Sequence, residues 1–219
     1  FTLQHVDKAA VIATEDDPSR MIASRINHRL VRVSSADADD QAMWPALQGP
    51  HNAQNAAAAR AVCTILGVPA EAIAAGLRSY PGLPHRMERI RERGGVLYVN
   101  DSKATNPTST APALAAYPAI RWIVGGQAKT ADLDACAPWF GHVRAAYTIG
   151  EAGAMFADLL APHMKVESCG TLEQAVAAAS ADADAGETVL LSPACASFDQ
   201  FRDYEDRGAR FRALVEGLA

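Results

Sequence analysis

Short apolar runs alternate with helical segments from residue 95 to the end of the chain, and this alternation limits the possible folds more than any other feature. Four such runs predict strands, at 95–102 (where the strand passes into a loop), 121–126, 145–150 and 188–194, and the more polar segment 165–170 predicts a short strand. Segments with helix caps or helical spacing follow them, at 106–117, 131–141, 151–162, 171–183 and 197–218. Strands and helices in this order are typical of a mostly parallel sheet covered on both faces. We therefore expect an α/β fold with a Rossmann-like sheet.

The first 80 residues carry a shorter version of the same pattern. Strands are predicted at 9–14 and 29–35, and helices at 16–26, 51–66 and 67–80. Segment 80–86 then places two prolines and a glycine within four residues, which is typical of a linker between domains. The sequence therefore predicts two domains, 1–82 and 83–219.

Charge and cysteine usage exclude several classes of protein. The formal net charge is −5 and the pI is about 5.7, whereas a general nucleic-acid binder carries a basic surplus. No run reaches eighteen apolar residues, so no membrane insertion is expected. The four cysteines have neither CxxC spacing nor paired histidines, which argues against a disulfide scaffold and against a metal site. We expect a cytoplasmic, monomeric protein with reduced thiols and no nucleic-acid partner.

Polar residues gather in the loops that follow the predicted strands, which is where an open parallel sheet binds its ligands. The loop 100–107 contains Asp101, Ser102, Lys103 and Thr105 at a helix entrance. Backbone N–H groups and the helix dipole attract anions at such a position. A helix cap with solvated neighbours explains the same residues, so the loop predicts either an anion or nucleotide site, or a simple cap.

Two more strand-end loops carry candidate ligand residues. The sequence GGQAKT at 125–130 places Lys129 after paired glycines, which let a backbone approach a ligand closely. A glycine turn with a solvated lysine is the alternative. The loop 192–201 contains Ser197, whose hydroxyl could bind a carboxylate, and Cys195, which we expect to be a packed thiol and not a nucleophile. No G-x-x-x-x-G-K-[ST] phosphate loop occurs in the 219 residues.

Three candidates lie outside these loops. Arg86 follows the predicted linker, and its guanidinium suits a phosphate, although a salt bridge accounts for it equally well. Asn52 and Asn55 lie near the start of the helix 51–66, where capping explains one of them. Taken alone, the residues predict a cytosolic α/β protein that binds small anionic ligands between two domains.

Six segments together resemble the Mur ligase family, in the branch that adds D-glutamate. They are GPHNAQNAAAA (49–59), YPGLPHRME (80–88), VNDSKATN (99–106), GGQAKT (125–130), CGTLEQAV (169–176) and LSPACASFDQF with the following YEDRG (191–208). The resemblance extends from about residue 11 to residue 218, and DSKATN and SPACASFDQF are its most specific strings. Other members of the family carry an Asp-Tyr motif where this chain has Asp101-Ser102.

The resemblance implies an ATP-dependent ligase that joins D-glutamate to UDP-N-acetylmuramoyl-L-alanine through an acyl phosphate, in bacterial peptidoglycan synthesis. Members have three domains, and their phosphate loop and Mg²⁺ ligands lie in the central one. Residues 1–82 are therefore expected to be the C-terminal remainder of the central α/β ATPase domain, and 83–219 the Rossmann-like C-terminal domain. Because no phosphate loop is present, this chain is expected to be inactive by itself.

By motif position, the resemblance also assigns roles to single residues. The resemblance implies that four residues face ATP: Asn52, Asn55 near the base, Arg86 toward the phosphates and Asp101 near the ribose. For D-glutamate binding it selects Thr105, Lys129, Ser197, Phe198 and Tyr204, the last at the edge of the pocket. Lys103 is expected to be catalytic, on either the phosphate or the substrate.

Two alternatives stay open at this point. One is another glutamate-adding ligase of the same superfamily, similar to folylpolyglutamate synthase, which a comparison of D- with L-glutamate on a UDP-muramoyl acceptor would separate. The other is a Rossmann-like domain that binds a nucleotide without catalysis. A reading frame without an upstream phosphate loop would favour that second alternative.

Overall fold

The computed structural model describes residues 9–38 and 40–218. The chain forms two compact units, Phe1–Pro81 and Gly82–Ala219, and each is described by itself. Within the part of the chain that is described, no helix combines the length and the apolar character needed to cross a bilayer.

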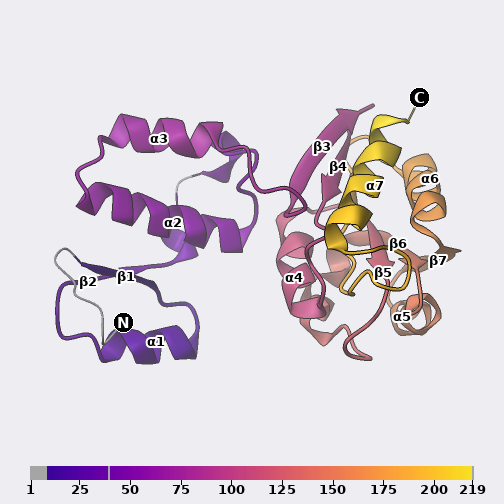
Figure 1. Ribbon diagram of the computed structural model, residues 1–219, viewed down its shortest axis with the longest axis horizontal. Coiled ribbons are helices and arrows are strands. Elements are labelled where there is room, and N and C mark those ends of the chain that lie inside the picture. Colours follow the sequence, from indigo (N-terminus) through magenta and orange to yellow (C-terminus); the bar gives the residue numbers. More distant parts are fainter. Residues whose placement is uncertain (1–8, 39, 219) are drawn as a thin grey trace. The chain divides into compact units, whose positions relative to one another are not determined.

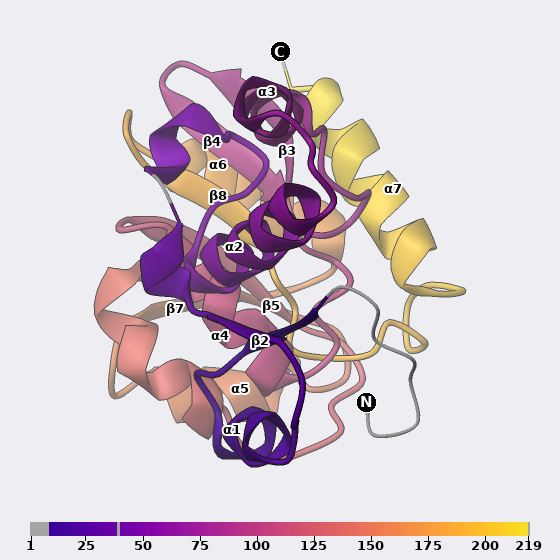
Figure 2. The ribbon, with the colours of Figure 1, turned by 90° about the vertical axis from the view of Figure 1, so that its left-hand side faces the viewer.

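The N-terminal unit is a short parallel strand pair between helices. Strand β1 (Ala10–Ala13) pairs in parallel with β2 (Leu30–Val33). The helices are α1 (Asp17–Ser24), α2 (Pro50–Ile65) and α3 (Ala70–Ser79), with 3₁₀ turns η1 (Ser35–Asp37) and η2 (Gln41–Met43). Figures 1 and 2 show the strands between α1 and α2, and α3 beyond α2. The helix α2 approaches the strands closely because its inner face carries only small buried side chains, Ala53, Ala56 and Ala57.

In the C-terminal unit, six strands form one sheet in the order β3-β4-β8-β5-β6-β7. Along the chain these are β3 (Glu88–Arg93), β4 (Val96–Asn100), β5 (Ile120–Gly125), β6 (Val143–Ile149), β7 (Lys165–Gly170) and β8 (Thr188–Leu191). Strand β3 pairs antiparallel with β4, and the other pairs are parallel. This confirms the expected mostly parallel α/β sheet, and it places the carboxyl ends of β4 to β8 side by side.

Helices cover both faces of this sheet (Figure 1). They are α4 (Pro107–Ala116), the 3₁₀ helix η3 (Asp134–His142) and α5 (Gly153–Leu160) on one face, and α6 (Leu172–Asp182) and α7 (Tyr204–Glu216) on the other. Neighbouring residues of β5 alternate between the two cores, because side chains of a strand point to opposite faces. Trp122 belongs to the core beneath α4 and α5, and Ile123 to the core beneath α6 and α7; both are 0% exposed.

Three elements differ from the sequence predictions. The edge strand β3 was not predicted, because its sequence ERIRER has no apolar run. The segment predicted as a helix at 131–141 forms the 3₁₀ helix η3, whose interior Pro138 has no N–H for α-helical hydrogen bonding. The last helix begins at Tyr204 and not at residue 197, because Asp203 caps it by accepting a hydrogen bond from the Asp206 amide (2.8 Å).

Candidate functional site

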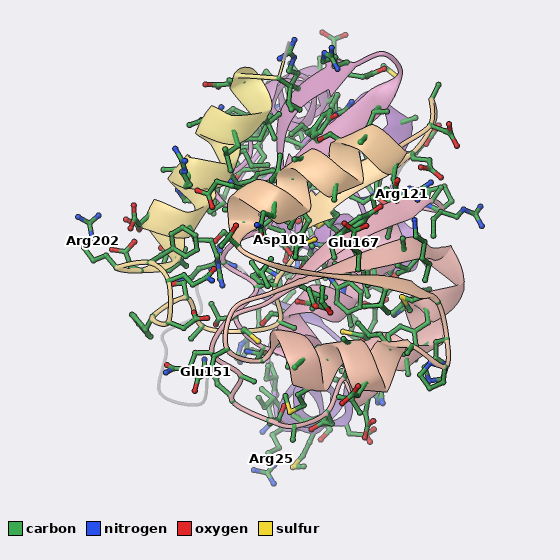
Figure 3. All side chains as sticks on the ribbon, turned by 90° about the vertical axis from the view of Figure 1, so that its right-hand side faces the viewer. Arg25, Asp101, Arg121, Glu151, Glu167 and Arg202 are labelled. Atoms are coloured by element: carbon green, nitrogen blue, oxygen red, sulfur yellow. The ribbon has the colours of Figure 1, made fainter. Side chains whose placement is uncertain are left out.

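The candidate site lies at the carboxyl ends of the parallel strands of the C-terminal unit. Strand β8 pairs with both β4 and β5, so the loops after these three strands are neighbours. In Figure 3, Asp101, which follows β4, lies inside the fold, whereas Arg121, near the start of β5, lies at the opposite end of the sheet. Glu151, after β6, points outward.

A glycine lets the loops after β5 and β8 approach each other. Gly126 has a φ of +126°, and a Cβ there would lie 2.4 Å from the carbonyl oxygen of Ala196. The next residue, Gln127, exchanges two backbone hydrogen bonds with Ala196, each 2.9 Å from N to O. The sequence GGQAKT therefore does more than form a turn, because it joins the β5 loop to the β8 loop.

Four of the residues assigned to the amino-acid substrate lie in these joined loops and in the loop after β4. The Lys129 ammonium, which is exposed, donates a hydrogen bond to the Thr105 hydroxyl (3.4 Å from Nζ to Oγ1). Ser197 is 2% exposed, and its neighbour Phe198 is 68% exposed. The structure thus brings the Lys129 ammonium and the Thr105 hydroxyl into contact, and a cation beside a hydroxyl at the carboxyl end of a sheet suits a carboxylate.

Lys103 and Tyr204 are brought together although they are about a hundred positions apart in the sequence. The Lys103 Nζ lies 3.7 Å from the centroid of the Tyr204 ring, which is a cation–π contact. The Tyr204 hydroxyl donates a hydrogen bond to Glu205 (2.8 Å). The aromatic ring therefore holds the ammonium near the start of α7.

Asp101 is buried, at 7% exposure, and both of its carboxylate oxygens accept hydrogen bonds. The donors are the Ser192 hydroxyl (2.8 Å) and the Met87 amide (3.1 Å). Burial raises the pKa of the Asp101 carboxyl to about 7, against the opposing effects of these hydrogen bonds and of Arg86. A carboxylate has about four lone-pair sites, so each oxygen keeps acceptor capacity beyond these two bonds.

Arg86 lies in a segment that is tied to the C-terminal unit. Its neighbour His85 has a φ of +62°, and the His85 carbonyl accepts a hydrogen bond from the Lys103 amide (3.0 Å). The buried Asn100 amide group contacts both His85 Nδ1 (3.0 Å) and Glu88 (3.1 Å). The Arg86 side chain is exposed, so its guanidinium is accessible to an anion.

The two asparagines assigned to ATP lie in the N-terminal unit, whereas the eight other assigned residues belong to the C-terminal unit. Asn52 donates a hydrogen bond to the Gln48 carbonyl (3.0 Å), and Asn55, which is exposed, donates to the Asn52 side chain (3.4 Å). Asn106 is the residue that caps α4, through the Ser109 amide (2.9 Å), so capping does not account for the other polar residues of its loop.

No three His, Cys, Asp or Glu side chains in the described ranges are grouped closely enough to hold a metal ion. The described residues therefore contain no preformed cluster of protein ligands for a metal ion. Cys195 is buried, and burial raises the pKa of its thiol to about 12. A thiol in this state is a poor nucleophile.

One central residue was missed by the sequence analysis. Arg207, on α7, is 1% exposed and donates hydrogen bonds into the loops after β4 and β8. Burial lowers the pKa of its guanidinium to about 10, so it stays charged at neutral pH. A signal was present, because Arg207 occupies the same helical stripe as the buried Phe211 and Val215. A charged residue on an apolar stripe indicates a buried polar role.

Comparison with known proteins decides the family. The family profile described as "Mur ligase, glutamate ligase domain" matches residues 85–195. The chain belongs to the Mur ligase family. The matched Mur ligase segment contains the β4 and β5 loops with Lys103, Thr105 and Lys129.

Curated relatives support the same family. The UDP-N-acetylmuramoylalanine–D-glutamate ligase of Sphingopyxis alaskensis is 60% identical over 225 residues, which cover all of this chain and 52% of that protein. The protein of the same name from Zymomonas mobilis is 56% identical over 221 residues, with 50% of its length covered. The chain thus spans about half the length of the curated relatives it matches.

Solved structures share the fold at low sequence identity. Escherichia coli FolC in complex with DHPP and ADP has a TM-score of 0.62 and 22% identity, covering 96% of this chain and 54% of that one. The UDP-N-acetylmuramoylalanyl-D-glutamyl-2,6-diaminopimelate–D-alanyl-D-alanyl ligase of Acinetobacter baumannii also has a TM-score of 0.62, with 17% identity, covering 95% of this chain and 51% of that one. At this level of identity, the two solved structures show only that the Mur ligase chain shares their fold.

Proposed function

We propose that this chain supplies the amino-acid-binding half of an ATP-dependent ligase that adds D-glutamate to UDP-N-acetylmuramoyl-L-alanine in peptidoglycan synthesis. The observation that carries the proposal is the contact between the Lys129 ammonium and the Thr105 hydroxyl at the carboxyl end of the sheet. It occurs in a chain that is 60% identical to a ligase of that name. The enzyme would act in the cytoplasm as a monomer.

In this proposal the N-terminal unit is the C-terminal remainder of the ATP-binding domain, and residues 83–219 are the C-terminal ligase domain. The exposed amide of Asn55 and the exposed guanidinium of Arg86 suit the base and the phosphates of ATP. Asp101 would accept a hydrogen bond from a ribose hydroxyl through the lone pairs left on its oxygens. Mg²⁺ would be bound by residues outside this chain.

The reaction transfers the terminal phosphoryl group of ATP to the carboxylate of the UDP-linked alanine, and ADP leaves. The D-glutamate amine then attacks the acyl carbon, and inorganic phosphate leaves through a tetrahedral intermediate. The residues of this chain would orient the amine and balance negative charge, which are positioning and electrostatic tasks. Lys103 carries the catalytic role in this proposal, because its ammonium is held on the Tyr204 ring and it belongs to the same strand-end loop as Thr105.

The charge of D-glutamate explains the composition of the site. Its two carboxylates would be bound by the Lys129 ammonium and by the hydroxyls of Thr105 and Ser197. Phe198 and Tyr204 would cover the aliphatic part of the substrate, because Phe198 exposes most of its ring beside Ser197.

Lys129→Ala is expected to weaken D-glutamate use specifically. The test protein is a fusion in which the N-terminal half of the Sphingopyxis alaskensis ligase precedes these 219 residues. Loss of a charge-assisted hydrogen bond costs about 1.5–3 kcal/mol, or about 10- to 150-fold in kcat/KM, carried mainly by KM for D-glutamate. Steady-state kinetics with each substrate varied in turn measures it.

Lys165→Ala is the matched control for this experiment. Lys165 is also an exposed lysine, but it begins β7 at the opposite end of the sheet and pairs with Asp182 (2.9 Å). Its replacement should leave all three KM values unchanged. An unchanged KM for D-glutamate in Lys129→Ala would remove Lys129 from the site, and L-glutamate used as readily as D-glutamate would refute the proposed substrate.

The 219-residue chain alone is expected to release no ADP in the presence of all three substrates. It contains no phosphate loop, and a ligase of this kind must bind the phosphates of ATP before any acyl phosphate forms. A coupled ADP assay on the purified chain, beside the fusion as positive control, checks this. ADP release by the chain alone that depends on D-glutamate would contradict the expectation.

A further inference from the structure

Arg207 occupies a position where a charged side chain is costly. Its neighbours on the inward stripe of α7 are Gly208, Phe211 and Val215, which are all buried. Arg207 forms no ion pair with a described carboxylate; Asp199 is the nearby acidic group that acts on it electrostatically. A buried cation without a paired anion loses its hydration, so the hydrogen bonds of the guanidinium must offset that cost.

The guanidinium donates four hydrogen bonds. Arg207 Nε donates to the Ser102 hydroxyl (2.9 Å) and one terminal nitrogen to the Ser102 carbonyl (2.8 Å). That same nitrogen donates to the Cys195 carbonyl (3.1 Å), and the other terminal nitrogen donates to the Ala196 carbonyl (3.3 Å). Four of the five N–H groups of the arginine fork are thus used.

These acceptors belong to two separate loops of the candidate site. Ser102 directly precedes Lys103, and Ala196 directly precedes Ser197. The Ser102 hydroxyl also donates to the carbonyl of Tyr204 (2.8 Å), one helical turn before Arg207. The one guanidinium therefore connects the loops after β4 and β8 with the start of α7.

The third loop packs against the same group. A Cβ added at Gly126 would lie 3.2 Å from a terminal nitrogen of Arg207, so the β5 loop that carries Lys129 passes directly over the guanidinium. Lysine could not replace the fork, because its donors all sit on a single nitrogen and cannot reach carbonyls on both sides.

We propose that Arg207 is a positioning residue for the amino-acid site, because its guanidinium sets the spacing between the loop that carries Thr105 and the loop that carries Ser197. This inference rests on the function proposed above. Arg207 itself contacts backbone and Ser102, and it acts on the substrate through the residues that follow these contacts.

The test uses Arg207→Lys and Arg207→Met in the fusion. Both are expected to raise KM for D-glutamate by about tenfold or more, because a displaced loop misplaces the carboxylate ligands. KM for ATP and for the UDP-linked acceptor should change by less than about threefold. If Arg207→Lys raises the KM for D-glutamate as Arg207→Met does, then positive charge alone is not sufficient and the hydrogen bonds of the guanidinium are required.

Arg210→Lys and Arg210→Met are the matched controls. Arg210 lies on the exposed side of the same helix and pairs with Glu173 (2.7 Å), so its variants should keep the wild-type KM values. If the Arg207 variants fail to fold, Ser102→Ala removes one partner of the guanidinium, and it should raise KM for D-glutamate without changing that for ATP.

Hydrogen exchange on the 219-residue chain separates failure of this inference from failure of the proposed function. Arg207→Lys should accelerate amide exchange in residues 102–106 and 195–197, while the strands keep their protection. A fusion without D-glutamate ligase activity would overturn the proposed function, and the exchange result alone would then decide the role of Arg207. An active fusion in which Arg207→Lys keeps the wild-type KM for D-glutamate, or unchanged exchange in both loops, would overturn the inference.

Discussion

Gly208→Ala is expected to destabilise the C-terminal unit by roughly 1–3 kcal/mol, as overpacking of a core does. Alanine in a helix interior is ordinarily more favourable than glycine by about 1 kcal/mol, so the expected sign is reversed. The cause is that a Cβ at Gly208 in α7 would lie 2.1 Å from His85 Nδ1.

The His85 ring cannot easily move away from that Cβ. Its Nδ1 lies 3.0 Å from the buried Asn100 amide nitrogen, and its backbone carbonyl accepts a hydrogen bond from the Lys103 amide. The left-handed backbone at His85 further limits where the side chain can point. Relief of the clash would therefore disturb the segment that presents Arg86.

Gly76→Ala is the matched control for this prediction. Gly76 lies inside α3 of the N-terminal unit, and a Cβ there would meet no atom within 4 Å. That substitution should stabilise its own unit by about 0.5–1 kcal/mol. The double variant Gly208→Ala with His85→Gly should recover stability, because it removes the ring and glycine adopts a positive φ freely.

Urea unfolding, monitored by hydrogen exchange in each unit separately, measures these changes in stability. A Gly208→Ala variant that is as stable as the wild type, or more stable, would show that the His85 ring is not fixed in this place.

Asp101→Asn is expected to change how the stability of the C-terminal unit depends on pH. The pKa of Asp101 is raised from 3.8 to about 7 by burial, so between these values the folded state binds a proton that the unfolded state has released. The contribution of Asp101 to stability is therefore complete below about pH 4 and is lost as the pH rises toward 7. The slope is about 1.4 kcal/mol per pH unit, and the total loss is about 4 kcal/mol at most.

The asparagine variant removes this titration but keeps the shape of the side chain. Its carbonyl can still accept from the Met87 amide, and its amide can donate to the Ser192 hydroxyl. We expect the wild type to lose free energy of unfolding relative to Asp101→Asn between pH 5 and pH 7, and no further difference to develop above pH 7. Denaturant unfolding of both proteins at several pH values measures it.

Asp182→Asn is a control with the opposite electrostatics. The hydrogen bonds that Asp182 accepts from Lys165 and Tyr147 lower its pKa, so its contribution is lost only as the pH falls below the usual range of a carboxyl. Its replacement should leave the pH dependence between pH 5 and pH 8 unchanged. If the free energy of unfolding of the wild type and of Asp101→Asn changed in the same way between pH 5 and pH 7, Asp101 would be ionised in the folded protein over that range.

The sequence predicted much of the fold because its signals are local. Apolar runs identified the strands β4, β5, β6 and β8, and the short β7 was predicted although its sequence is more polar. Helix caps such as Asn106 and Thr171 act within three residues of their own position. The exceptions were also local in origin. The strand β3 carries charged side chains where a run of apolar ones was required, and Pro138 prevents the α-helix that the surrounding residues favour.

The candidate site was predictable as a set of loops, but not as an arrangement. The rule that ligands bind at the carboxyl ends of parallel strands selected the segments with Lys103, Lys129 and Ser197. No local pattern indicates which strand will lie beside which. The contact of Lys129 with Thr105 joins the loops of β4 and β5, two strands that are not neighbours in the sheet because β8 lies between them.

By itself, the sequence determined the α/β class, the strand-end loops and the polar residues available in them, because periodicity and capping act between near neighbours. The tertiary structure alone decided how these residues combine. Arg207 donates a hydrogen bond to Ser102, 105 positions earlier in the sequence. The burial that raises the pKa of Asp101 is produced by segments that are distant in the sequence and pack around it only in the folded chain. Hydrogen bonding and desolvation depend on distance in space, and in this chain the decisive distances are set by strand order.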